Sequence, residues 1–342
     1  MRVGLPREIK DGERRVALTP EAVRSLSHVV VEPGAGAAAG FADDEYLAAG
    51  AAFGDPWQCE LVVKVKELQA PELGRPRAGQ TVFCFQHFAP HPEILDAALA
   101  SGATFIAYET VGEADGRLPI LAPMSAIAGR LAVQAGMWCL QTQNGGSGVL
   151  LPGLDGVPPG KVAIVGAGNV GANALAVAHG LGARVSVFAR SDRRFAALRR
   201  KFPNASYRAG LERATIVDAD LIIAGVLTPG QMSPKLIDRA MLAAMRPGSV
   251  LVDVGIDQGG IAETSRPTSH SRPTYIEEGV VHCCVPNLPA ACARTASQAL
   301  SRAVLPYVQR LLRNELDGDL ATGVQVRAGK VVHGKLARDT GR

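Results

Sequence analysis

The sequence predicts an α/β protein with two Rossmann-like domains, each a doubly wound and mostly parallel sheet. Short apolar runs alternate with helical patterns in two series along the 342 residues, and a glycine-rich turn follows the first apolar run of the second series. Repeated strand–helix alternation is typical of a parallel sheet that is covered on both faces. A chain of this length suffices for two domains of ordinary size. We expect ligands to bind in a cleft between them.

The first series predicts strands that alternate with short helices. The strands are expected at residues 3–6, 29–34, 61–67, 81–85 and 104–109. The helices are expected at residues 20–26, 41–50 and 92–102. Most of these helices have Pro or Asp near their start and Gly at their end, which are ordinary helix boundaries.

A weakly polar stretch from Leu121 to about Gln143 separates the two series. Its Ala, Leu and Met residues favour a helix, and Ser125 is a plausible early cap. The strands of the second series are expected at 161–168, 184–190, 219–226 and 248–255, and the segment 280–289 ends the unit. A helical pattern at 293–312 and a mostly polar tail follow.

These features divide the chain into two expected domains. The N-terminal catalytic or substrate domain is discontinuous and takes residues 1–120 together with 291–342. The dinucleotide-binding domain takes residues 121–290.

Composition excludes several classes of protein. The net charge is only +4, and the densest basic stretch, residues 193–201, is interleaved with Phe195 and Leu198, which favours a solvated helix face over a nucleic-acid site. The uncharged window 162–183 holds five glycines, so we predict strand, turn and helix there and no membrane span.

The cysteines favour a reducing compartment. None of the six forms a CxxC pair or has histidines at zinc spacing, so we expect no metal. Most lie in apolar runs, as buried reduced thiols of a cytoplasmic protein do, and the N-terminus lacks a signal-peptide core.

The most informative local motif is VAIVGAGNVGANALAVAHGLGA, residues 162–183. Gly166, Gly168 and Gly171 give GxGxxG directly after an apolar strand and directly before a helical pattern that begins near Asn169 and Val170. The first glycine allows a tight turn, the second admits a pyrophosphate, and the third allows close helix–strand packing. The motif therefore predicts a bound dinucleotide, with its phosphates at the helix N-terminus.

The end of the next strand bears on the choice of cofactor. NAD-binding proteins place an acidic residue there to bind the ribose 2′-hydroxyl. This chain instead has Ala189, Arg190 and Ser191. An arginine with a serine suits a 2′-phosphate, so NADP(H) is favoured. NAD(H) remains possible, with Arg190 an ordinary surface residue and Asp192 reaching the ribose.

Several ordered segments carry a resemblance to a known family. They include PREIKDGERRVALTP, VVKVKE, FCFQHFAP, LPILAPMSAIAGRLA, GAGNVGANA, GVLTPG, LVDVGIDQGG and VPNLPA. The chain resembles the alanine dehydrogenase family, whose fold is shared with the soluble nucleotide-binding domain of proton-translocating transhydrogenase. The resemblance spans nearly the whole chain. Ala189–Arg190 departs from it, because the family usually has an acidic residue at that strand end.

The resemblance implies roles for four charged or titratable residues. Arg15 and Lys66 would hold the carboxylate and carbonyl of a 2-oxo acid, a task that suits fixed cations. His87 would be the general acid/base, since histidine titrates near neutrality. Asp257 would orient ammonia or water. From the residues alone, the two cations are equally compatible with solvated charges, His87 with a structural histidine, and Asp257 with a turn-initiating residue.

The resemblance also places neighbours of the ligands. Met124 and Asn287 would line the substrate pocket. Ser125 would lie close to the cofactor, with Val226 and Leu227 beside it.

The sequence therefore predicts an NADP(H)-dependent amino-acid dehydrogenase that aminates a 2-oxo acid or reduces an imine. Alternatives are an NAD-linked L-alanine dehydrogenase, a saccharopine-dehydrogenase-like enzyme, a transhydrogenase-type nucleotide-binding subunit and a non-catalytic NADP-binding sensor. The expected partners are a small-molecule 2-oxo acid, amino acid or imine and further copies of the chain, as a dimer or hexamer, with no nucleic acid and no membrane.

Overall fold

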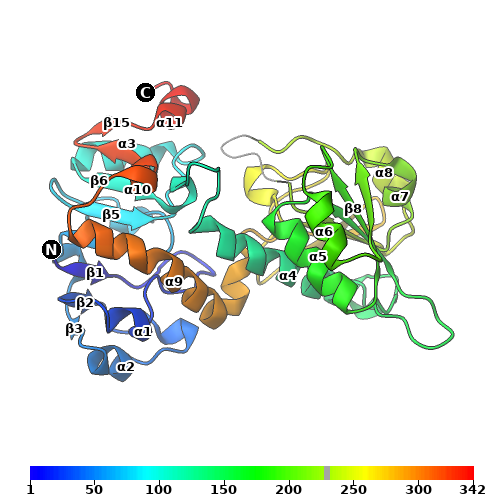
Figure 1. Cartoon of the computed structure of the whole chain (residues 1–342), viewed down its shortest axis with the longest axis horizontal. Coiled ribbons are helices and arrows are strands. Elements are labelled where there is room, and N and C mark those ends of the chain that lie inside the picture. Colours follow the sequence, from blue (N-terminus) through cyan, green and yellow to red (C-terminus); the bar gives the residue numbers. More distant parts are fainter. Residues whose placement is uncertain (227–231) are drawn as a thin grey trace. The chain divides into compact units, whose positions relative to one another are not determined.

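The chain forms two compact units, seen in a computed structural model that describes residues 1–226 and 232–342. One unit takes Met1–Met124 and Ala290–Arg342, and the other takes Ser125–Pro289 (Figure 1). Each unit contains one sheet, and the functional roles of the two units remain proposals.

The first unit is built on an eight-stranded sheet of order β15-β14-β6-β5-β4-β1-β2-β3. The strands are β1 Val3–Leu5, β2 Val29–Val31, β3 Ala52–Phe53, β4 Leu61–Val63, β5 Thr81–Cys84, β6 Thr104–Ala107, β14 Val324–Arg327 and β15 Lys330–Val331. The strands from β1 to β6 pair in parallel, whereas β14 and β15 are antiparallel. Numbered along the chain, the parallel part has the order 3-2-1-4-5-6, so its topological switch point lies between β1 and β4.

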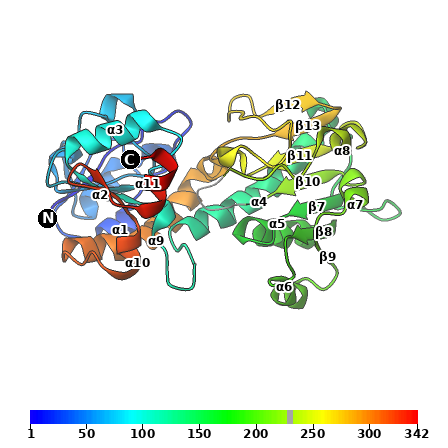
Figure 2. The same ribbon diagram turned by 90° about the horizontal axis from the view of Figure 1, so that it is seen from above.

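Helices cover both faces of this sheet. They are α1 Pro20–Val23, α2 Asp43–Ala48, α3 Pro92–Ser101, α9 Ala293–Leu312, α10 Gly318–Thr322 and α11 Gly334–Thr340. Helix α3 begins at a proline, ends before Gly102 at φ 67°, and buries Ile94, Leu95 and Ala98 against one face of the sheet. Figure 2 shows α3 on one side of the sheet and α9 with α10 on the other.

The second unit has a seven-stranded sheet of order β12-β13-β11-β10-β7-β8-β9. The strands are β7 Lys161–Val165, β8 Arg184–Ala189, β9 Ser206–Ala209, β10 Leu221–Ala224, β11 Val250–Asp253, β12 Thr274–Glu277 and β13 Val280–Cys283. Only β12 is antiparallel to its neighbour. The parallel strands again have the order 3-2-1-4-5-6, with the switch point between β7 and β10.

Close helix packing brings α4 and α5 to one face of this second sheet. The helices of the unit are α4 Leu121–Cys139, α5 Asn169–Gly180, α6 Phe195–Lys201, α7 Arg213–Val217 and α8 Arg239–Ala243, with the first four residues of α4 in the other unit. A Cβ on Gly129 of α4 would lie 2.1 Å from the carbonyl oxygen of Val170 in α5, so only glycine allows this approach. The opposite face packs Val165, Ile222 and Leu251 against residues of α7 and α8.

Seven 3-10 helices complete the described structure. They are η1 Ala37–Ala39, η2 Pro56–Gln58, η3 Ala70–Glu72, η4 Tyr108–Thr110, η5 Thr142–Asn144, η6 Ile256–Gln258 and η7 Leu288–Cys292, counted over the described residues.

The predicted fold class is confirmed: two mostly parallel sheets, each covered by helices. The window 162–183 is strand, turn and helix as predicted, and no helix in the described ranges is long and apolar enough to cross a membrane. The sequence did not predict β3, β9, β12 or the folded tail, where β14 and β15 extend the first sheet. The predicted cleft between the domains stays a prediction.

Candidate functional site

The glycine-rich turn lies at the switch point of the second sheet. Gly166 follows β7 with φ 112°, and a Cβ there would meet the carbonyl oxygen of Gly225 at 2.6 Å. A Cβ on Gly171 would lie 1.7 Å from the carbonyl oxygen of Gly166. At Gly168 only the Arg194 guanidinium, 3.8 Å away, comes within 4 Å of the Cβ position. The first and third glycines are therefore required for packing, whereas the second leaves space for a ligand.

This geometry fits a pyrophosphate. Gly168 immediately precedes the twelve-residue helix α5, and no side chain caps that end of the helix. Asn169 and Val170 lie in its first turn, whose N–H groups suit an anion. Val226 lies beside the turn, because a Cβ on Gly166 would come within 3.2 Å of its backbone nitrogen. Leu227 is outside the described residues.

The end of β8 carries positive charge in place of a carboxylate. Ala189 is the last residue of the strand and is partly buried, while Arg190, Ser191 and Asp192 are exposed. Arg194, also exposed, brings its guanidinium toward Gly168. Arginine side chains therefore lie near both the end of β8, at Arg190, and the glycine turn, at Arg194.

Buried charges surround the switch point of the first sheet. Glu8, after β1, accepts hydrogen bonds from the backbone N–H groups of Val65 (2.6 Å) and Lys66 (3.3 Å), after β4. Lys64 is fully buried and pairs with Glu8 (3.3 Å) and Glu72 (2.9 Å). Burial alone would lower the pKa of Lys64, but these carboxylates hold it above its usual value. Lys64 is thus a structural cation. The segment that carries Lys66 is held by the ion pairs of Lys64 and by the hydrogen bonds from its backbone to Glu8.

His87 follows β5 and is held by two glutamates. Its backbone has φ 46°, and its N–H donates to Oε1 of Glu109 at 2.9 Å. Its Nδ1 lies 3.0 Å from Oε2 of Glu67, whose side chain is 2% exposed against 32% for His87. The Lys10 ammonium contacts the other oxygen of Glu67. The exposed part of the imidazole therefore belongs to its other edge.

Arg15 is a buried cation with a buried counter-ion. Its Nε and Nη2 donate to the two carboxylate oxygens of Glu13 at 2.7 and 2.6 Å, and its Nη1 lies 3.2 Å from the sulfur of Met124. Helix α9 steadies this segment, since Ser297 accepts from the N–H of Val16 at 3.0 Å. Glu13 is also close enough to Glu8 to raise its pKa, although burial is the larger cause. Arg15, Met124, Lys66 and His87 all belong to the first unit.

Asp257 lies in η6, after β11, and is exposed. Asp253, the last residue of β11, stabilises this turn: its carboxylate accepts from the N–H groups of Gly255 (3.2 Å) and Ile261 (2.8 Å). The Lys235 ammonium binds the carbonyl oxygens of Gly259, Gly260 and Ala262 at 2.6 to 3.0 Å. Side chains of Asp253 and Lys235 therefore hold the backbone of the turn that carries Asp257.

Asn287 and Ser125 complete the predicted set in the second unit. Asn287 follows β13 in a left-handed conformation with φ 61° and is partly buried. Ser125 is a partly buried residue of α4. Asp257, Asn287 and Val226 all follow carboxyl ends of neighbouring strands of the second sheet, the edge at which α/β sheets bind ligands.

Sequence reasoning missed the carboxylates that hold the candidate residues: Glu8, Glu13, Glu67 and Glu109. Each is an acidic residue that looks like a solvated charge when taken alone. The available signal was position, because Glu67 and Glu109 end the predicted strands 61–67 and 104–109. Parallel strand ends meet at one edge of the sheet, where His87 also lies.

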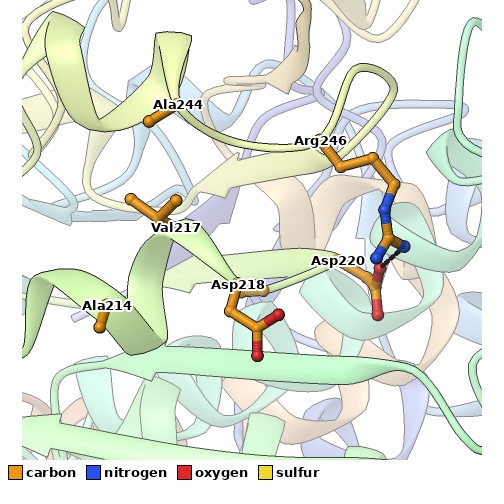
Figure 3. Close-up of a pocket in the computed structure, with 7 residues that line it drawn as sticks. Ala214, Val217, Asp218, Asp220, Ala244 and Arg246 are labelled. Atoms are coloured by element: carbon orange, nitrogen blue, oxygen red, sulfur yellow. Dashed lines mark hydrogen bonds and ion pairs between the residues drawn. The ribbon is translucent and has the colours of Figure 1, made fainter.

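A cavity of about 280 Å³ lies elsewhere in the second unit. Figure 3 shows Asp218 and Asp220, at the amino end of β10, with Arg246 across the opening. The charges there are paired: Arg246 with Asp220 at 2.8 Å and Lys161 with Asp218 at 2.7 Å. The cavity is at the edge opposite the glycine turn and does not belong to the candidate site. Within the described ranges, no three His, Cys, Asp or Glu residues gather as a metal site.

Comparisons with known proteins agree with this arrangement. Residues 4–128 match the family model described as alanine dehydrogenase/PNT, N-terminal domain, and residues 132–334 match the corresponding C-terminal domain. The alanine dehydrogenase of Halomonas elongata is 47% identical over an alignment that covers 100% of this chain and 97% of that protein. The alanine dehydrogenase of Mycobacterium tuberculosis is 41% identical, with the same coverage.

Solved structures give the same result. A structure of L-alanine dehydrogenase matches with a TM-score of 0.95 and 43% identity, over 100% of this chain and 99% of that one. A transhydrogenase from Sinorhizobium meliloti matches with a TM-score of 0.83 and 26% identity, over 98% and 99% of the two chains. The chain therefore belongs to the alanine dehydrogenase/PNT family and is an NAD(P)-dependent amino-acid dehydrogenase.

Proposed function

We propose that the protein is an L-alanine dehydrogenase. The reaction is L-alanine + NAD(P)⁺ + H₂O giving pyruvate + NH₄⁺ + NAD(P)H + H⁺. Relatives named alanine dehydrogenase cover the whole chain, which favours alanine over the broader class of amino acids. The observation that carries the proposal is that buried carboxylates in the first unit hold the Arg15 guanidinium, the His87 imidazole and the Lys66 backbone.

The proposed roles follow from the contacts. Arg15 and Lys66 bind the carboxylate and the carbonyl oxygen of pyruvate. Both are cations: Glu13 holds the guanidinium of Arg15, and Glu8 holds the backbone of Lys66. The nicotinamide, when bound, accepts or donates a hydride at its C4. His87 moves the proton that accompanies addition of water or ammonia at the substrate C2, and Asp257 orients that nucleophile. The protein contributes mainly orientation and charge placement.

His87→Asn tests the acid/base role directly. Wild-type protein incubated with pyruvate, nitrogen-labelled ammonium and reduced cofactor is expected to release labelled L-alanine, detected by mass spectrometry. His87→Asn is expected to lower kcat by about 100-fold or more, because a general acid/base contributes that much. His179→Asn, in helix α5, is the matched control and keeps the wild-type rate. No labelled alanine from the wild type rejects the function, and an active His87→Asn enzyme rejects the role of His87.

The cofactor has two candidates. NAD(H) is the ordinary cofactor of the family and is at least as well supported as NADP(H). A preference for NADP(H) is favoured by one feature of this chain, the Ala189–Arg190 strand end with Arg194 near Gly168. An arginine pair at that place suits a 2′-phosphate, whereas no carboxylate ends the strand to receive a 2′-hydroxyl.

Calorimetry decides between the two candidate cofactors. It measures the binding of NADH and of NADPH to wild type, Arg190→Ala and Arg200→Ala. Arg200 is an exposed arginine of α6 and serves as the control. An NADPH preference that only Arg190→Ala removes supports a 2′-phosphate site. Equal or tighter binding of NADH by the wild type assigns the protein to the NAD-linked enzymes.

The family also leads us to propose a homo-oligomer, a dimer or a hexamer. Trp138 of α4 is 45% exposed, and Leu154 and Ile276 are exposed in the same unit, so apolar surface is available for such contacts. Light scattering of the purified protein gives the mass, and a monomer would contradict the proposal.

A further inference from the structure

Glu67 has a geometry that the roles above do not use. Its carboxylate is almost fully buried at the end of the segment that follows β4, and its Oε2 lies 3.0 Å from Nδ1 of His87. The opposite oxygen contacts the ammonium of Lys10, whose side chain is 34% exposed. The carboxylate therefore lies between the imidazole and a cation, with each oxygen engaged by one of them.

The contact fixes the tautomer of a neutral His87. A carboxylate only accepts hydrogen bonds, so Nδ1 must carry the proton and Nε2 must carry the lone pair. When the ring is protonated, Nδ1–H still donates to Glu67, and Nε2–H becomes the donor. One nitrogen is thus dedicated to Glu67 in both states, and the other exchanges the proton.

Charges around the pair favour an ionised Glu67. Burial would raise the pKa of Glu67, but His87, Lys66 and Lys10 outweigh it and hold the pKa well below its usual range. Glu109 is a further charged group near this pair, and it accepts from the backbone N–H of His87. Glu67 is therefore ionised at neutral pH and presents a negative charge to the imidazole.

The backbone and ring of His87 are held by contacts separate from the Glu67 bond. His87 is left-handed at φ 46°, a conformation that costs a non-glycine residue of order 1 kcal/mol or more. Glu109 holds the backbone, and Phe85 stacks on the ring at a centroid distance of 5.9 Å. These contacts place the ring plane, and the bond to Glu67 determines which nitrogen faces outward.

We propose that Glu67 is the positioning residue for His87: it selects the Nδ1–H tautomer, directs Nε2 to the substrate and stabilises the imidazolium. The proposal rests on the acid/base role proposed for His87. Lys10 opposes the effect of Glu67 on His87, because its positive charge offsets the negative charge of the same carboxylate and disfavours a protonated ring. The two residues therefore have opposite effects on the protonation of the ring.

The competing explanation is that Glu67 only anchors the loop. A structural anchor would affect the amount of folded protein and leave the pH dependence of His87 unchanged. The pH dependence therefore decides between the two, and it is measured in two ways, by turnover and by a chemical probe that needs no turnover.

Three variants are compared with wild type: Glu67→Gln, Glu67→Asp and Lys10→Gln. Alanine oxidation requires the neutral ring as base, so its rate falls on the acid side of the profile. Glu67→Gln is expected to lower kcat by about 100-fold, to leave the KM for alanine nearly unchanged, and to move the acid limb to lower pH. Glu67→Asp keeps the charge and restores the limb. Lys10→Gln moves the limb to higher pH.

Reaction of His87 with diethyl pyrocarbonate, followed by peptide mass spectrometry, gives the same information without turnover. The reagent attacks the neutral ring, so the pH midpoint of modification should fall in Glu67→Gln and rise in Lys10→Gln. Glu60→Gln, an exposed carboxylate that accepts from the Arg2 backbone, is the control and leaves the midpoint unchanged.

Opposite shifts in the two variants support the proposal, and an unmoved midpoint in either one overturns it. If Glu67→Gln does not fold, as judged by thermal unfolding, the Lys10→Gln and Glu67→Asp midpoints decide. A wild type that shows no turnover of alanine contradicts the proposed function, while the chemical midpoints still test Glu67.

Discussion

The orientation of Arg15 is determined by its carboxylate partner, Glu13. Glu13 binds Nε and Nη2 of the guanidinium with two short bonds and is itself buried. A bidentate carboxylate fixes the plane of the guanidinium as well as neutralising it. The group that binds the substrate carboxylate in our proposal is therefore oriented before substrate arrives.

Glu13→Gln is expected to raise the KM for pyruvate about tenfold, with a smaller change in kcat. Loss of one charge-assisted pairing is worth roughly 1.5–3 kcal/mol, and it affects bound substrate and transition state alike. Steady-state kinetics measures both constants. Glu32→Gln, which removes a partly exposed carboxylate that accepts from the Arg7 backbone, is the matched control. An unchanged KM in Glu13→Gln would mean that Glu13 does not orient Arg15.

Glu67 also links stability to pH. Its pKa is lower in the folded chain than in the unfolded chain, so its ionised form stabilises the fold at neutral pH. That stabilisation is complete above the unfolded value of about 4.3 and is lost as the pH falls toward the lower folded value. Denaturant unfolding at several pH values should show a gap in free energy between wild type and Glu67→Gln that narrows below about pH 4. A gap that is constant with pH would contradict a lowered pKa.

At the residue scale, the sequence predicted chemistry better than it predicted contacts. Arg15, Lys66, His87 and Asp257 were identified by resemblance, and their roles remain proposals. Apart from Glu13, two residues before Arg15, their carboxylate partners are distant in the sequence: Glu109 is 22 residues from His87 and Glu8 is 58 from Lys66, so no local pattern pairs them. Only the strand order brings such residues to one edge.

The glycine turn is the element in which sequence and structure agree most closely. Gly166 needs its positive φ, Gly171 has no room for a Cβ, and Gly168 has space. Each observation matches one of the roles that the spacing predicts for a dinucleotide turn. Substitution of each of the three glycines is therefore expected to have a different effect on folding and cofactor binding.

Three alanine substitutions test this difference. Gly171→Ala is expected to destabilise the protein by about 1–3 kcal/mol or more and to abolish cofactor binding, because its Cβ would overlap the Gly166 carbonyl. Gly168→Ala should fold normally and bind cofactor more weakly. Gly180→Ala, at the other end of α5 with nothing within 4 Å, should be neutral or stabilising by up to about 1 kcal/mol. Calorimetry and thermal unfolding distinguish the three, and tight cofactor binding by Gly171→Ala would contradict the account.

Other elements were not predictable from local pattern. Strand β14 lies in the polar tail and pairs antiparallel with β6, more than 200 residues earlier in the chain. Strand β3 has only two residues, and β9 and β12 are edge strands with exposed side chains. Short edge strands owe their conformation to the neighbour with which they pair, so their own sequence carries little signal.

At the scale of the whole molecule, both units use the same strand order, 3-2-1-4-5-6, around a switch point. In the first unit, Lys66 and His87 follow the carboxyl ends of β4 and β5. In the second, the glycine turn, Val226, Asp257 and Asn287 follow carboxyl ends of strands. Each sheet thus presents its candidate residues at the edge where such sheets bind ligands. The candidate substrate residues therefore come from both units, whereas the glycine turn lies in the second unit.

The most direct test of the proposed function is the ranking of 2-oxo acids by kcat/KM with ammonium and whichever reduced cofactor binds. The panel is pyruvate, 2-oxobutyrate, 2-oxoisovalerate and 2-oxoglutarate, followed by loss of cofactor absorbance. We predict that pyruvate has the highest kcat/KM and that alanine is the best substrate of the reverse reaction. A higher kcat/KM for a larger 2-oxo acid, or no turnover of pyruvate with either cofactor, would contradict an alanine dehydrogenase.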